Sequence, residues 1–132
     1  MSQNLIALNL TADDIAAIDA ALATLETRLA ALVELSPDER RSLAKMGDKS
    51  EAFCRPTLIV LDQNRQIVPA GLDLAAAESD LQQLDLLRPR LARLRRLTTR
   101  AEDTEMALGS DVLSAALEGY ALAKVFGKGA GL

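Results

Sequence analysis

The chain has 132 residues and a formal net charge of −4 at pH 7, with one cysteine and no histidine. The missing histidine excludes His-dependent catalytic triads, and with a single cysteine it also excludes an ordinary Cys and His zinc site within one chain. A net acidic protein has no long-range attraction for nucleic acid or for an anionic membrane surface. A chain of this length can bury roughly two-thirds of its unfolded surface, so we expect a single domain over residues 1–132.

The composition also limits which residues can form the core and which cellular compartment suits the protein. Hydrophobic residues make up 49% of the chain but aromatic residues only 2%, so the core has to be built from Leu, Ile, Val and Ala. Residues 1–10 contain no Lys or Arg and no long apolar stretch, unlike a secretory signal. No segment reaches the roughly 20 apolar residues that span a bilayer. With Cys54 as its one thiol, the chain suits a reducing compartment, and we expect a cytoplasmic protein without membrane association.

The first predicted elements are an extended N-terminal arm over residues 1–10 and a helix from Thr11 to Leu35. Thr11 is an N-cap with Asp14 three residues later, which is a carboxylate form of the capping box. Apolar residues then recur at alternating steps of three and four, the period of a helix face that packs against another helix. They are Ile15, Ile18, Leu22, Leu25, Leu29 and Leu32.

Two further helix starts follow. Ser36 and Pro37, with Glu39 as the reciprocal partner, predict a short helical segment that continues to about Met46. Gly47 ends that segment, and residues 48–51 provide another cap before an apolar helix that contains Pro56. Proline either kinks this helix or marks its true beginning. The residues Pro69, Ala70 and Gly71 predict a turn.

The longest pattern begins after Asp73, which caps the last helical region. From Leu84 to Phe126, small and apolar residues recur at steps of three and four without a slip of register, interrupted at Glu105. An unbroken helix over residues 73–126 would be about 80 Å long. We therefore expect a turn, either at Thr98 and Thr99 or at Gly109 and Ser110. Gly127 is expected to end the helix and to leave a flexible tail over residues 127–132.

These patterns predict an all-α fold. We expect an antiparallel helical bundle with four main helices and one short extra helical turn. In that bundle the apolar ridge near each end of the chain packs against the other.

Six arginines between residues 88 and 100 are the most unusual feature of this acidic chain. Counted from Leu84, Arg88, Arg90 and Arg95 flank the apolar stripe, whereas Arg93, Arg96 and Arg100 point outward. The flanking group suits ion pairs with acidic residues of the first helix, such as Asp19, Glu26 and Glu34. The other interpretation is a site for an anion or an acidic partner. RNA and single-stranded DNA are disfavoured because aromatic stacking surfaces are nearly absent.

An acidic cluster follows the arginines. Glu105 lies on the apolar seam, where a carboxylate is costly unless it is paired. Dinuclear metal sites in helical bundles use a Glu-x-x-His unit, which a chain without histidine cannot supply, so no metal or cofactor is expected. The candidate charged interaction surface therefore consists of Arg88, Arg93, Arg96, Arg100, Glu102, Asp103 and Glu105.

Two smaller features bear on association and reactivity. The first helix carries alanine over much of its outer face, which reflects either helix propensity or close approach of another helix. The second interpretation predicts a homodimer. Cys54 lies beside Arg55, which favours a nucleophilic or redox-sensing thiol as one interpretation. Burial as a small apolar residue is the favoured interpretation.

The sequence thus contains no recognisable catalytic, cofactor-binding or metal-binding motif. We expect a protein that is not an enzyme and that acts in protein–protein interaction as a scaffold, adaptor or chaperone-like bundle, as a homodimer with an unidentified protein partner. The alternative is a small-ligand or anion binder that uses the arginine cluster at residues 88–100.

Overall fold

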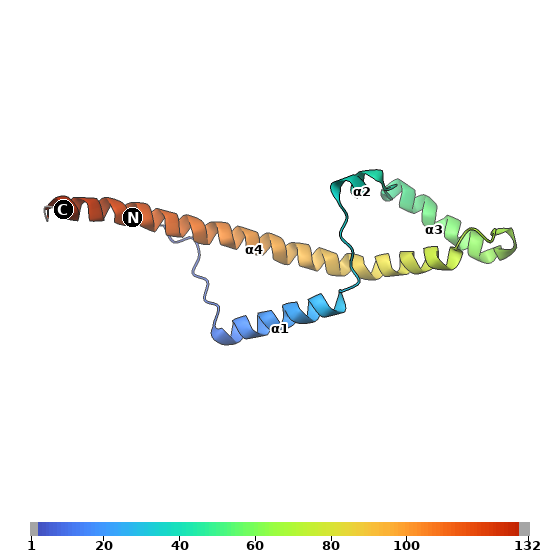
Figure 1. The fold of residues 1–132 in the computed structure, drawn as a ribbon, viewed down its shortest axis with the longest axis horizontal. Coiled ribbons are helices and arrows are strands. Elements are labelled where there is room, and N and C mark those ends of the chain that lie inside the picture. The colour runs from blue at the N-terminus through green and yellow to red at the C-terminus, as the bar shows by residue number, and fades with distance from the viewer. Residues whose placement is uncertain (1–2, 130–132) are drawn as a thin grey trace. The chain divides into compact units, whose positions relative to one another are not determined.

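The computed structural model describes residues 3–129, and every regular element in that range is a helix (Figure 1). The all-α class is confirmed. The elements are α1 (Ala12–Arg28), α2 (Pro37–Ser42), α3 (Asp48–Gln63), the short 3₁₀ helix η1 (Arg65–Ile67) and α4 (Leu74–Gly129).

The predicted helix starts at Thr11, Ser36 and Asp73 are confirmed by their hydrogen bonds. The side-chain cap predicted at residues 48–51 is wrong, because α3 begins after Gly47, which makes no side-chain cap bond. The backbone N–H of Thr11 donates to the Asp14 carboxylate at 3.0 Å, and the N–H of Asp14 donates to the Thr11 hydroxyl at 3.1 Å. Ser36 and Glu39 form the same reciprocal pair at the start of α2. At the start of α4, the carboxylate of Asp73 accepts a bond from the N–H of Ala76. Each cap satisfies backbone donors that the first helical turn leaves without partners.

Two helix ends differ from expectation. α1 ends at Arg28 rather than at Leu35, so Leu29 and Leu32 lie outside it. α2 ends at Ser42, four residues before Met46. Ser36 has extended backbone angles, as expected for a residue before proline, because the proline ring disfavours the helical conformation there.

Proline does not begin α3. The helix starts at Asp48, after Gly47 as N-cap, and Pro56 lies inside it. A proline within a helix removes one backbone hydrogen bond, so this position weakens α3 without ending it.

α3 and the beginning of α4 form an antiparallel hairpin around the turn at residues 69–71. Three ion pairs join the two sides of the hairpin: Arg65 with Glu78, Arg55 with Asp85, and Glu51 with Arg88. Residues that come earlier in α3 therefore contact residues that come later in α4, as in an antiparallel pair. Leu74, at the start of α4, is the one buried residue in the described range, with 4% of its surface exposed.

α4 is unbroken from Leu74 to Gly129, so the expected turn near Thr98 or Gly109 is wrong (Figure 1). Both candidate positions accept helical geometry, since threonine and glycine lower helix stability by about 1 kcal/mol or less. Thr104 bonds back to the carbonyl of Arg100 at 2.7 Å, within the helix. Gly127 is also helical, which corrects the expected tail; residues 130–132 lie outside the described range.

By its contacts the chain divides into two units. The first combines Met1–Thr27 with Ala92–Leu132, and the second is Arg28–Leu91. In the first unit the apolar ridge of α1 stays exposed, including Ile15, Ile18 and Leu22. The antiparallel bundle built on this ridge is therefore not confirmed, and the single domain stays a prediction.

Replacing the buried leucine tests the hairpin. We expect Leu74→Ala to lower the free energy of unfolding by about 2–4 kcal/mol, since it removes a buried side chain and leaves a cavity. Leu86→Ala is the matched control, because Leu86 is exposed on the same helix. Urea denaturation monitored by circular dichroism measures both, and equal losses in the two variants would contradict the hairpin packing.

Candidate interaction surface

The structure gives Arg88 a partner on α3. Its guanidinium contacts the carboxylate of Glu51 at 2.7 Å, and Glu51 also accepts a bond from Arg55 at 3.0 Å. Arg55 in turn holds Asp85 through two hydrogen bonds at 3.0 and 2.5 Å. Arg88 therefore belongs to an ion-pair network within the hairpin, and the expected pairing with the acidic residues of the first helix is not what the structure shows for it.

The network shifts the ionisation of its members in the expected directions. Hydrogen bonds from Arg88 and then from Arg55 lower the pKa of the Glu51 carboxyl. A hydrogen bond from Arg55 lowers the pKa of Asp85. Two carboxylates raise the pKa of Arg55 above its ordinary value, with Asp85 contributing most. All four side chains stay accessible to solvent, so the pairs orient the hairpin more than they stabilise it.

The other candidate residues all lie on α4 in the first unit and are exposed. They are Arg93, Arg96, Arg100, Glu102, Asp103 and Glu105. Among residues 3–129, no ion pair of the structure includes any of them. The structure thus places all seven predicted site residues on α4. Six of them make no ion pair within residues 3–129, and the seventh, Arg88, is paired with Glu51 of α3.

Large apolar side chains are exposed over the C-terminal part of α4. On the apolar seam, Val112, Leu122 and Phe126 expose 68%, 67% and 72% of their surfaces. A second line beside the seam is also exposed. We call the whole set the C-terminal apolar surface: Met106, Val112, Leu113, Leu117, Tyr120, Leu122, Val125 and Phe126.

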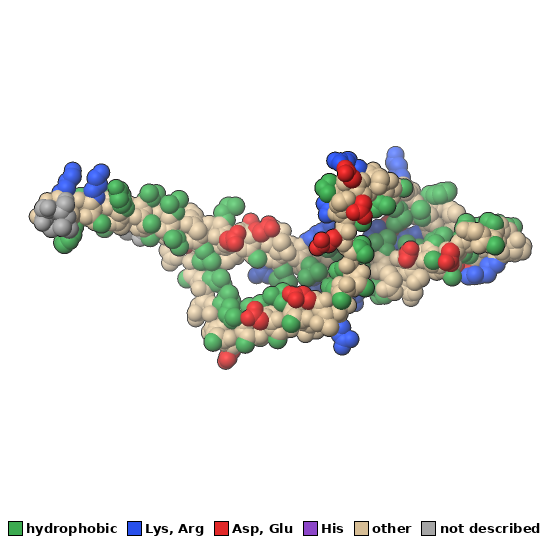
Figure 2. Space-filling view, in the orientation of Figure 1, with side chains coloured by type: hydrophobic (Ala, Val, Ile, Leu, Met, Phe, Trp, Pro, Cys, Tyr) green, Lys and Arg blue, Asp and Glu red, His purple; other side chains and the backbone are tan. Residues whose placement is uncertain are grey.

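In the space-filling view, hydrophobic side chains gather along this end of α4 (Figure 2). A helix segment that exposes this many large apolar side chains is uncommon on a soluble monomer and favours contact with another protein or a ligand. The C-terminal apolar surface extends around two sides of the helix, so one neighbouring helix would not cover all of it. The spacing of apolar residues in the sequence predicted the seam of α4, but it did not predict the second line of exposed apolar residues beside it.

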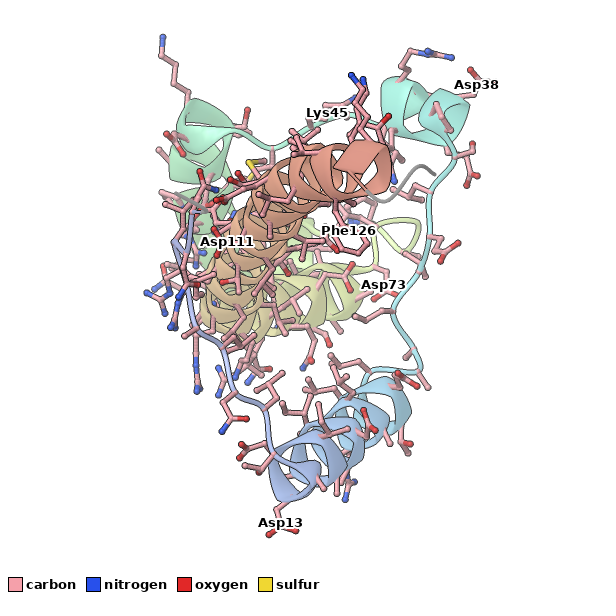
Figure 3. The ribbon with its side chains drawn as sticks, turned by 90° about the vertical axis from the view of Figure 1, so that its left-hand side faces the viewer. Asp13, Asp38, Lys45, Asp73, Asp111 and Phe126 are labelled. Atoms are coloured by element: carbon pink, nitrogen blue, oxygen red, sulfur yellow. The ribbon has the colours of Figure 1, made fainter. Side chains whose placement is uncertain are left out.

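The N-terminal arm is hydrogen-bonded to one flank of α4, chiefly to the carboxylate of Asp111 (Figure 3). Asp111 accepts bonds from the backbone N–H of Leu5 at 2.8 Å and of Ile6 at 3.2 Å. The side-chain amide of Gln3 adds bonds to Ser110 at 2.6 Å and to Asp111 at 3.2 Å. The arm is thus extended, as expected, and is held on one flank of α4.

Sequence reasoning missed this contact. Ser110 and Asp111 interrupt an apolar stretch, which is a signal that α4 carries a polar spot on that flank. The partner could not be identified from the sequence, because the arm offers backbone N–H groups, which every residue except proline has.

Cys54 lies in an apolar groove of the hairpin. The groove has a volume of about 370 Å³ and is lined by α3 residues such as Phe53 and Leu58 and by α4 residues such as Leu81 and Leu84. Cys54 is half-buried rather than fully buried. Its surroundings in the groove are mainly apolar, as is typical of a packing cysteine.

Within the described part of the chain, no three Cys, Asp or Glu side chains gather where a metal ion would bind. In the same part of the chain, none of the helices is both long enough and apolar enough to cross a bilayer. Comparison with known proteins gives no match: no family model, no curated protein and no solved structure resembles the chain.

Removing the Asp111 carboxylate tests the attachment of the arm. In Asp111→Ala, we expect the backbone amides of Leu5 and Ile6 to exchange with solvent about three- to tenfold faster, because both lose their acceptor. Hydrogen exchange followed by NMR measures this, and Asp103→Ala on the same helix is the control.

The pH dependence follows from the same bonds. The N–H of Leu5, then that of Ile6, hold the pKa of Asp111 below its ordinary value of 3.8. Ionised Asp111 therefore favours the attached arm above that value, and the attachment is lost as the pH falls through the lowered pKa. Protection of the Leu5 and Ile6 amides, measured relative to their intrinsic exchange rates, that stays unchanged in both Asp111→Ala and acid would contradict the contact.

Proposed function

We propose that this chain is a non-catalytic interaction protein that forms a homodimer and binds another protein through its exposed helix faces. It acts as a scaffold, adaptor or chaperone-like protein, and its single thiol suits the cytoplasm. The observation that carries the proposal is the C-terminal apolar surface on α4.

The energetics of burial support association. Fully burying a large apolar side chain is worth about 1.5–3 kcal/mol relative to leaving it exposed. α4 exposes eight such side chains between Met106 and Phe126. Even partial burial of this set against a second protein would offset the several kcal/mol that association costs in lost freedom of motion.

The charges on α4 support the same proposal. Arg93, Arg96 and Arg100 lie on its outward side, where a bound protein with acidic groups would meet them. Binding sites for small anions usually gather donors from several elements into a concave site. These three arginines come from one helix, and Arg88 is already engaged by Glu51. The anion-binder alternative therefore has less support than the interaction protein.

Light scattering tests the homodimer. For the unmodified chain of 14.1 kDa, we expect twice that mass at micromolar concentration. The double variant Leu122→Glu with Phe126→Glu should have the monomer mass, because two charges are costly to bury in an apolar contact.

The control carries the same number of charges on apolar residues outside this surface. Val33→Glu with Leu86→Glu alters two exposed side chains of the second unit and should leave the dimer intact. A monomer mass for the unmodified chain across micromolar concentrations would refute the homodimer.

A further inference from the structure

The seam of α4 has the seven-residue repeat of a coiled coil, in which positions a and d form the contact and positions e and g flank it. Beyond the hairpin, the a positions are Leu91, Thr98, Glu105, Val112, Gly119 and Phe126. The d positions are Leu94, Ala101, Leu108, Ala115 and Leu122. The repeat continues over the part of α4 where the large side chains are exposed.

The e flank of this seam is open. It carries Arg95, then Glu102, then Gly109 and Ala116, so a charged stretch is followed by small residues. A Cβ atom added at Gly109 would meet nothing within 4 Å. The N-terminal arm lies on the other flank, where Asp111 is a g residue. A second helix can therefore approach from the e side.

Charge disfavours a parallel pair. In a parallel coiled coil, a g residue of one helix faces the following e residue of the other. Here Arg90 would face Arg95 twice, once on each side of the pair. Like charges at these positions oppose association and help to determine the orientation of the partner.

In an antiparallel pair, e residues face e residues, and the register can shift by whole heptads. One register places Arg95 opposite Glu102 of the second copy, and the symmetry repeats this pair. A shift of one heptad in either direction sets Glu102 against Glu102 or Arg95 against Arg95. Only the first register sets Arg95 against Glu102 and leaves no like charges facing each other on the e flank.

We propose that α4 pairs with α4 of a second copy in this antiparallel register, with the twofold axis between Thr99 and Arg100. This inference rests on the proposed homodimer and adds its geometry. Leu91 then packs on Leu108 of the second copy, and Thr98 packs on Ala101. Glu105 meets Leu94 of the second copy, and the adjoining Arg95 supplies the cation that a carboxylate on the seam requires.

In the same register, two seam residues of the C-terminal apolar surface, Val112 and Leu122, lie opposite earlier residues of α4 in the second copy. Ala115 comes to the level of Leu84 of the second copy, and Leu122 comes to the level of Ala77. Both Ala77 and Leu84 line the apolar groove of the hairpin.

Reciprocal charge reversal tests the register. Arg95→Glu alone should weaken the dimer about tenfold or more, because the introduced carboxylate would face Glu102 twice. Glu102→Arg alone should do the same with two arginines. An equal mixture of the two variants should form a mixed dimer with the affinity of the unmodified chain, since both contacts then join opposite charges. Native mass spectrometry distinguishes the three species by mass.

Lys124→Glu is the matched control, because it reverses an exposed charge on the outer side of α4 outside the candidate charged interaction surface and should leave the dimer intact. Dimers of the two test variants that form unhindered and mix statistically would overturn the register while leaving the homodimer standing. Tighter association of Arg95→Glu alone would indicate a parallel pair. A monomeric unmodified chain would instead refute the proposed homodimer itself.

Discussion

The constraint on which the structure depends is the apolar seam of α4, which continues for several heptads beyond the hairpin. A helix owes most of its stability to the packing of its apolar face rather than to the propensities of its residues. In α4 that face is partly covered by α3 near Leu74, but it is exposed at Val112, Leu122 and Phe126. The length of the helix is therefore understandable if another molecule completes its packing.

The charged residues that pair within the hairpin differ from those that we assign to association. Within the hairpin, the carboxylates of Glu51 and Asp85 each contact a guanidinium group. The charges of this network are therefore paired without a second molecule. Further along α4, a basic block ends at Arg100 and an acidic block begins at Glu102. Two such adjoining blocks complement each other when a second helix runs in the opposite direction, which links the charge order directly to antiparallel pairing.

Local signals in the sequence predicted local structure well. The caps at Thr11, Ser36 and Asp73 were correct because a cap involves only residues within one turn. The expected turn in α4 was wrong because it assumed that helices of the same chain must cover the seam. The helix propensities of Thr98 and Gly109 were too weak to decide between a turn and a continuous helix.

Long-range contacts were the least predictable part of the site. Arg88 was correctly placed on a flank of the seam, but its partner is Glu51 of α3 rather than a residue of α1. The bond between Asp111 and the N-terminal arm joins residues more than 100 positions apart through backbone groups, and composition and periodicity contain no information on it.

The direction of the α4 pair is the central claim, and distances between spin labels test it most directly. With Cys54→Ser as background, single labels are placed on the outer side of α4 at Asp103→Cys and at Lys124→Cys. For the antiparallel pair, the separation along the axis should be about 10 Å at position 103 and about 74 Å at position 124, from the 1.5 Å rise per residue. Equally short distances at both positions, as expected for parallel helices about 10 Å apart, would contradict the account.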